Sequence, residues 1–328
     1  MIRLLNILAS LKLTLVGMLL LGSGVLYAQD RSEASSAWMI APLALLALNL
    51  LAAMLVNRRF QRQPALLAFH VCLLMIVVLA GYGRLTQLEG RVEVSEGQVF
   101  DPEQVEVIQR GELHRFGLEP AAFEQGSIGV EYAPGMRRGQ TRSEVWTVDA
   151  QGHRTARTVG DDSPLLTSGY RFYTTSNKGF SILLNWTSRG GEIERGTVHL
   201  PSYPAWLLRQ KNLWLTPAGE ELELRLELER VPEEDAWVLE SRGRGAAITL
   251  QRQAGGDAIR LEPGESAEVE GGQVRFDELR MWMGYRISYD PTPPWIAASA
   301  LAAVLFMAWN FRQTLWSVAP AQAQGSEI

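Results

Sequence analysis

Long apolar runs lie at both ends of the chain, and a more polar stretch lies between them. The four runs with the length of a membrane-spanning helix are Leu11–Ala28, Trp38–Val56, Ala65–Tyr82 and Trp295–Phe311. Each holds roughly 17–19 residues, which as a helix rise about 26–28 Å and so approach the roughly 30 Å hydrocarbon core of a bilayer. The pattern therefore predicts four transmembrane helices, three N-terminal and one C-terminal.

These runs divide the 328-residue chain into four parts. We expect a membrane module of three helices in residues 1–83, a large domain in 84–294, a fourth span in 295–312 and a tail in 313–328. The first run ends in "VLYAQD", whose small residues also fit a signal-peptide cleavage site at Ala28. Because its apolar part is long for a signal peptide, we interpret this run as a retained span.

Loop charge predicts the orientation of these helices. The loop after the second run, "NRRFQRQP", holds Arg58, Arg59 and Arg62 and no acidic residue, whereas the loop after the first run, "QDRSEASSA", is balanced. Basic loops tend to remain on the cytoplasmic side of the membrane. We therefore expect both termini in the cytoplasm and the large domain outside the cytoplasmic membrane.

The large domain has the pattern of antiparallel β-structure. The segment "ELELRLELER" (221–230) alternates as a half-buried strand does, and "YRFYTT" and "FSILLNW" are typical of two further strands. Turn residues predict hairpins at Asp149–Gly152, Ala254–Asp257 and Gly271–Gly272. The fold class that follows is an α+β membrane protein whose large domain is a β-sandwich or barrel-like antiparallel fold.

Composition and charge exclude several classes of function. The net charge is −5 and no basic patch stands out in the large domain, so nucleic acid is not an expected partner. His114, His153 and His199 lie far apart without zinc-ligand spacing, and the single cysteine, Cys72, lies in the third apolar run. The domain offers no catalytic constellation, so no residue is assigned a catalytic role.

The third apolar run, "QPALLAFHVCLLMIVVLAG", contains His70, one of only four histidines. An imidazole within a span usually faces a protein interior, a partner or a cavity, and neutral imidazole is also a good iron ligand. Two interpretations remain open on the residues alone. His70 is either a ligand of haem iron or a packing residue that hydrogen-bonds another helix, for example through Asn49. Cys72 is best explained as a small buried hydrophobe.

Several segments resemble the ResB-like (CcsB) proteins of the System II cytochrome c maturation pathway. "LASLKLTLVGMLLL", "ALNLLAAML" and "AFHVCLLMIVVLAGYGRL" are similar to their first three spans, and "VSEGQVF" to the exit from the third. "NKGFSILLNW", "VHLPSYP" and "YDPTPPW" resemble the middle and the end of their outer domain. The family's order of parts, three spans, an outer β-rich domain and one closing span, matches the order expected here.

The resemblance implies a haem-handling role in a bacterial inner membrane. Members act with a CcsA-type partner that carries a Trp-rich "WWD" segment, and they deliver haem outward for attachment to apocytochrome c. The family's histidine in the third span falls on His70, which would then be an axial ligand of haem b, held transiently and shared with the partner. The "WWD" segment is absent from this chain. The implied role is a subunit of a haem lyase complex without the attachment step itself.

Two other classes of function compete with this interpretation. A haem-free structural subunit would scaffold a respiratory or maturation complex with the same arrangement of helices and domain. A sensor with an outer ligand-binding domain would need a cytoplasmic output, and the cytoplasmic parts expected here are short. The first competitor differs from the haem-handling role at one residue, His70.

Overall fold

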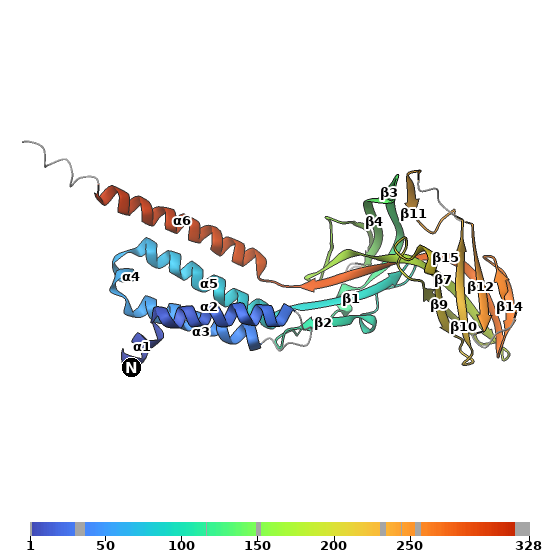
Figure 1. Cartoon of the computed structure of the whole chain (residues 1–328), viewed down its shortest axis with the longest axis horizontal. Helices are drawn as coiled ribbons and strands as arrows, with labels where there is room; N and C mark the ends of the chain where they lie inside the picture. Colours follow the sequence, from blue (N-terminus) through green and yellow to red (C-terminus); the bar gives the residue numbers. More distant parts are fainter. Residues whose placement is uncertain are drawn as a thin grey trace, which may run out of the picture. The chain divides into compact units, whose positions relative to one another are not determined.

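The computed structural model describes residues 2–29, 37–115, 117–148, 152–229, 234–243, 245–252 and 257–318 (Figure 1). The chain forms two compact units. The first, here the helical unit, comprises Met1–Glu89, Val107–Phe116 and Tyr289–Ile328, and the second, the β unit, comprises Gly90–Glu106 and Gly117–Ser288. Three separate segments of the chain therefore make up the helical unit.

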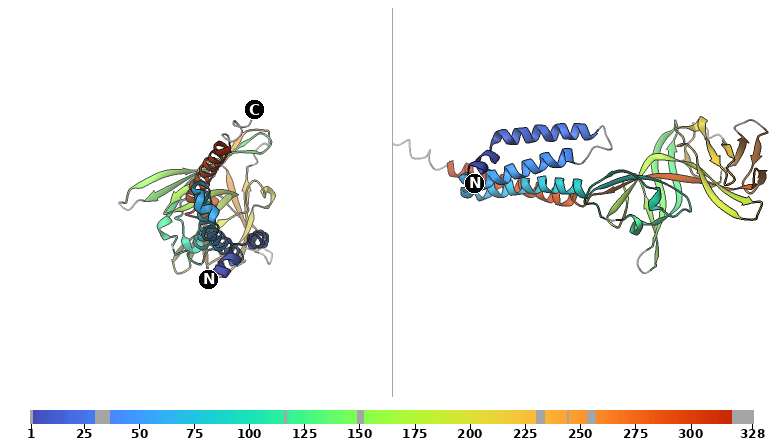
Figure 2. Two further views of the ribbon diagram at one scale, coloured as in Figure 1. Left: turned by 90° about the vertical axis from the view of Figure 1, so that its left-hand side faces the viewer. Right: turned by 90° about the horizontal axis from the view of Figure 1, so that it is seen from below.

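The described part of the helical unit contains six helices. They are α1 (Ile2–Leu8), α2 (Leu11–Gln29), α3 (Ala37–Val56), α4 (Arg58–Arg62), α5 (Pro64–Thr86) and α6 (Pro293–Val318). Helix α3 packs against α1, α2 and α5, and α5 also packs against α6 (Figure 2). Proline at the first position of α5 suits a helix start, because its missing N–H has no partner there in any case.

Three helices in the described residues are long and apolar enough to cross a membrane. These are α3, α5 and the segment Pro293–Leu315 of α6, whereas the apolar part of α2, Leu11–Tyr27, is shorter. Three predicted spans therefore coincide with helices of spanning length, and the first span remains a prediction. The expected tail 313–328 stays a prediction: α6 continues to Val318, and residues 319–328 lie outside the described part.

Close contacts hold α2 against α3. Gly24 lies so near the backbone carbonyl of Trp38 that a Cβ would not fit, and Gly17 packs against Leu46. Buried Asn49 of α3 accepts a hydrogen bond from the Thr14 hydroxyl at 2.7 Å and donates from Nδ2 to two carbonyls at the α1–α2 junction. Small residues at such interfaces let two helices approach closely where no hydrophobic effect drives them together.

A short segment of the helical unit is fastened to the end of α5. The N–H groups of Gly111 and Leu113 donate to the carbonyls of Gln87 and Leu85, at 2.9 and 2.8 Å. The buried ring of His114 lies with Nδ1 2.7 Å from the Thr86 carbonyl, which receives its proton. These bonds supply partners for carbonyls at the helix end, which otherwise lack them.

The strands are β1 (Leu88–Ser95), β2 (Glu106–Arg110), β3 (Phe123–Ala133), β4 (Arg137–Val148), β5 (Arg154–Val159), β6 (Leu165–Thr167), β7 (Tyr170–Ser188), β8 (Ile193–His199), β9 (Lys211–Leu215), β10 (Glu221–Leu228), β11 (Trp237–Leu239), β12 (Ala246–Arg252), β13 (Ile259–Leu261), β14 (Ser266–Val269) and β15 (Gly272–Tyr289). They form three sheets. The largest sheet has seven strands: five follow the order β2-β1-β15-β7-β6, β14 pairs with β15, and β8 pairs with β7. The two four-stranded sheets have the orders β13-β12-β10-β9 and β11-β3-β4-β5.

Antiparallel pairing agrees with the sequence-based expectation. The described strands form three sheets, and the sandwich or barrel-like arrangement stays a prediction. Strand β10 alternates between buried and more exposed positions as predicted. The hairpin at Gly271–Gly272 is confirmed by the pairing of β14 with β15. The other two predicted turns join the paired strands β4–β5 and β12–β13, although residues 149–151 and 253–256 lie outside the described part.

The two strands expected from "YRFYTT" and "FSILLNW" are one continuous strand, β7. The turn-like residues between them form a bulge, because Thr174 pairs with Tyr285 and Lys178 with Met283, so that three residues of β7 face Gly284 alone. A bulge absorbs extra residues without ending the strand. Local sequence therefore predicted a break where the pairing with β15 maintains continuity.

One carboxylate joins three parts of the β unit. The Glu96 carboxylate accepts the backbone N–H groups of Ile128 and Met281, at 2.8 and 3.0 Å, and the Ser241 hydroxyl at 2.7 Å. Gly97 follows with φ of +75°, a left-handed conformation that glycine adopts at no steric cost. The segment "VSEGQVF" is therefore a turn whose acidic residue binds β3 and β15.

Candidate functional site

His70 is the seventh residue of α5, roughly 9 Å along the helix from its start at Pro64. The helix forms here because "PALLAFHVCLL" begins with proline and continues as an apolar run without a helix breaker. The imidazole is half-buried. Sequence reasoning thus located the residue correctly on a helix long enough to span a membrane, near one end of it.

One ring nitrogen of His70 is held by the helix itself. Nδ1 lies 2.8 Å from the carbonyl oxygen of Leu66, one turn earlier. A peptide carbonyl can only accept a hydrogen bond, so Nδ1 carries the proton. In the neutral imidazole the lone pair is then on Nε2, which has no hydrogen bond to any residue that the structure describes. Histidine ligands of metals commonly have this arrangement, with the second nitrogen bonded to a carbonyl.

Two phenylalanine rings hold the imidazole from its sides. Phe60, buried on the short helix α4, meets it edge-on with ring centroids 4.6 Å apart, and Phe69 does so at 5.1 Å with an interplanar angle of 89°. These contacts and the bond to Leu66 restrict the ring's rotation. The short helix α4, which sequence analysis did not predict, is what brings Phe60 to His70.

The alternative contact between His70 and Asn49 is not formed. Asn49 bonds to Thr14 and to carbonyls at the α1–α2 junction, so its amide is occupied by other partners. The packing interpretation of His70 thereby loses its proposed partner, because the amide serves α1 and α2 instead. Cys72 is buried and carries a free thiol, as expected for a small hydrophobe.

The residues around His70 fit a haem iron by the chemistry of the donor. A neutral imidazole with a free Nε2 lone pair is a normal axial ligand. Leu66, Leu67, Leu73 and Leu74 on the same helix would offer apolar contacts to a macrocycle. Within the described residues, no three His, Cys, Asp or Glu side chains converge as a metal-binding group.

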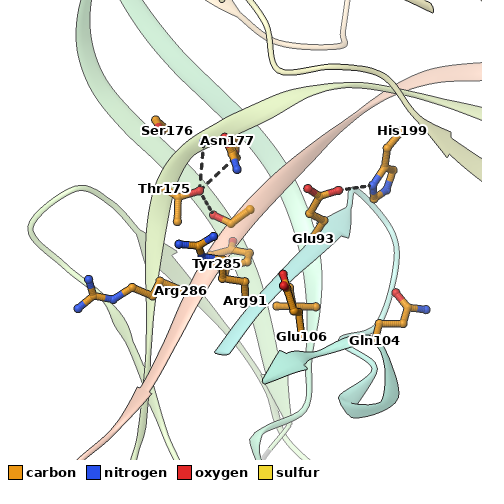
Figure 3. Close-up of a pocket in the computed structure, with 12 residues that line it drawn as sticks. Arg91, Glu93, Gln104, Glu106, Thr175, Ser176, Asn177, His199, Tyr285 and Arg286 are labelled. Atoms are coloured by element: carbon orange, nitrogen blue, oxygen red, sulfur yellow. Dashed lines mark hydrogen bonds and ion pairs between the residues drawn. The ribbon is translucent and has the colours of Figure 1, made fainter. Parts of the chain in front are cut away.

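A polar cleft of about 570 Å³ in the β unit is the second place where reactive side chains meet (Figure 3). His199, at the end of β8, lies with Nδ1 3.0 Å from the Glu93 carboxylate and Nε2 2.8 Å from the Ser95 hydroxyl. Its ring stacks on Trp282 at 5.5 Å. Sequence analysis missed this chain of contacts because β1 and β8 lie about a hundred residues apart and no short motif links them.

The order carboxylate, imidazole, hydroxyl resembles that of a hydrolase triad, but the hydroxyl is inaccessible. Ser95 is 0 % exposed and its Oγ also lies 3.1 Å from Ser181 Oγ in the interior. A nucleophile must be reached by its substrate. The contacts therefore join β1 to β7 and β8, and Ser95 is not accessible as a nucleophile.

The remaining histidines are separate from both places. His114 is buried against the end of α5 and the ring of Tyr289, and His153 is exposed. The tripeptide Asn185-Trp-Thr lies within β7, and the Asn185 amide donates to Asp277 at 2.6 Å. None of these residues adds to the site at His70.

No protein-family model matches the chain, and no curated protein matches it significantly.

Proposed function

We propose that this protein is a membrane subunit for cytochrome c maturation that binds haem b through His70 and acts with a CcsA-type partner. The observation that carries the proposal is the hydrogen bond from Nδ1 to the Leu66 carbonyl. It leaves the Nε2 lone pair without a partner among the described residues, on a helix long and apolar enough to cross a membrane. The resemblance of several segments to ResB-like proteins supports the same role.

The chain's own residues have a limited task in this role. His70 holds the iron from one side, Phe60 and Phe69 fix the orientation of the ring, and the apolar side chains of α5 exclude water. When bound, haem would supply the iron, and the CcsA-type partner would provide a further ligand for it. The β unit would dock the partner or the apocytochrome c, with the large domain in the periplasm and the termini in the cytoplasm.

The test is a reduced-minus-oxidised absorption spectrum of the full chain purified from membranes with its partner. Wild type is compared with His70→Gly and with His153→Ala, which removes an exposed histidine outside the helical unit. We expect haem bands in wild type and in His153→Ala, and their loss in His70→Gly. Added imidazole should restore the bands in His70→Gly, because it can occupy the space of the missing side chain.

The competing role, a haem-free scaffold, predicts different spectra. If all three proteins assemble with the partner and show the same bands, or none shows any, His70 is a packing residue and the proposal is wrong. Loss of the bands without rescue by imidazole, accompanied by loss of the partner, would show that the substitution only disturbs packing around Phe60.

A further inference from the structure

The helix next to His70 carries a cluster of cations. Arg58, Arg59 and Arg62 of α4 are all exposed, and the segment 57–65 contains no acidic residue. None of the three guanidinium groups has a salt bridge or hydrogen bond with any residue in the described part of the chain. Three adjacent unpaired guanidinium groups can bind an anion that is not part of this chain.

Helix geometry separates these arginines from the apolar side of α4. With about 100° between successive residues, the three arginines fall within an arc of roughly 100°, and Phe60 points to nearly the opposite side. Phe60 is buried and touches the imidazole of His70 at 4.6 Å between ring centroids. One turn of chain therefore contacts the candidate iron ligand on one face and presents the arginines on the other.

Haem has a matching division between polar and apolar parts. Most of its edge is hydrocarbon, and two propionate carboxylates lie together on one side. A haem held by His70 near the start of α5 would keep its hydrocarbon edge against the apolar helices and turn its carboxylates to the polar end, where α4 lies. Arginine pairs with carboxylates through two parallel hydrogen bonds, which makes it the residue best suited to this task.

We infer that Arg58, Arg59 and Arg62 bind the two haem propionates and so select haem over porphyrins that lack free carboxylates. This inference rests on the proposed function, because it requires haem at His70. The competing explanation is that the arginines only set the orientation of the helices or contact lipid phosphates. In that case the protein would bind haem and haem dimethyl ester, which has no free carboxylates, equally well.

The experiment measures the affinity of the detergent-solubilised full chain for haem and for haem dimethyl ester. The ester keeps the iron and the ring but has no carboxylate charge, and orientation in a membrane does not affect binding in detergent. The variants are Arg58→Gln/Arg59→Gln/Arg62→Gln and the matching triple substitution by lysine. Arg84→Gln is the control, because it removes a cation from the other end of α5, where Arg84 bonds to Gln109.

We expect wild type and Arg84→Gln to bind haem at least about tenfold more tightly than the ester, the factor that one charge-assisted pair of about 1.4 kcal/mol provides. The glutamine variant should bind both compounds equally, and the lysine variant should retain part of the preference. An unchanged preference in both arginine variants would overturn the inference while leaving His70 as the ligand. Wild type that binds neither compound would overturn the proposed function and the inference with it.

Discussion

Lys178 in β7 offers a direct test of how the β unit tolerates a buried charge. The residue is 2 % exposed, at the end of the bulge where it pairs with Met283. Its ammonium group has no salt bridge and no hydrogen bond to another described residue. An ammonium removed from water without a partner destabilises the folded state.

Burial lowers the pKa of Lys178 from 10.5 to about 8; the charge of Arg138 lowers it further, and that of Asp161 opposes the change. Below pH 8 the side chain is protonated in the folded and the unfolded state, so its destabilising effect is fully present. Between pH 8 and 10.5 only the unfolded state keeps the proton, so the free energy of unfolding rises with pH. The difference between a pKa of 10.5 and one of about 8 corresponds to at most about 3 kcal/mol in the free energy of unfolding. Wild type should regain about 2 kcal/mol of this stability between pH 7.5 and pH 9.5.

The assay is urea unfolding of the full chain in detergent, followed by tryptophan fluorescence at pH 7.5 and pH 9.5. Lys178→Met should be more stable than wild type at pH 7.5, and this difference should shrink by about 2 kcal/mol at pH 9.5, since only wild type gains stability. Lys211→Met is the control, because that exposed lysine pairs with Glu223 at the surface. A difference between Lys178→Met and wild type that stays constant over this range would refute the reasoning.

Two further substitutions test the packing of each unit. Glu96→Gln replaces a carboxylate oxygen by an amide N–H donor, so that one backbone N–H, most simply that of Ile128, loses its acceptor. We expect a loss of about 2 kcal/mol in the free energy of unfolding by urea. The surface substitution Glu131→Gln is the control and should cost less than about 0.5 kcal/mol. Gly24→Val should lower the thermal aggregation temperature in detergent, because the valine side chain would push α2 away from Trp38. Gly22→Val should not lower it, because a Cβ at Gly22 meets nothing within 4 Å. Equal effects of the two substitutions would contradict this packing of α2 against α3.

The pattern of apolar and polar residues predicted those helices and strands that depend mainly on residues close together in the sequence. Apolar runs placed α3, α5 and the core of α6, because an uninterrupted apolar stretch of that length has few alternatives. Alternation identified β10, and paired glycines identified the β14–β15 turn. The boundaries were less accurate: α5 and α6 both extend past the apolar residues that defined them, since helical hydrogen bonds continue while no breaker intervenes.

The sequence alone determined that an imidazole lies within an apolar helix and that arginines precede it. Only the tertiary structure decided that Asn49 bonds to α1 and α2, that α4 turns Phe60 onto the ring of His70, and that Glu93, His199 and Ser95 meet. The physical reason is the range of the interactions. Helix formation depends on residues within a turn or two of each other, whereas these contacts join segments whose approach depends on the packing of the whole unit.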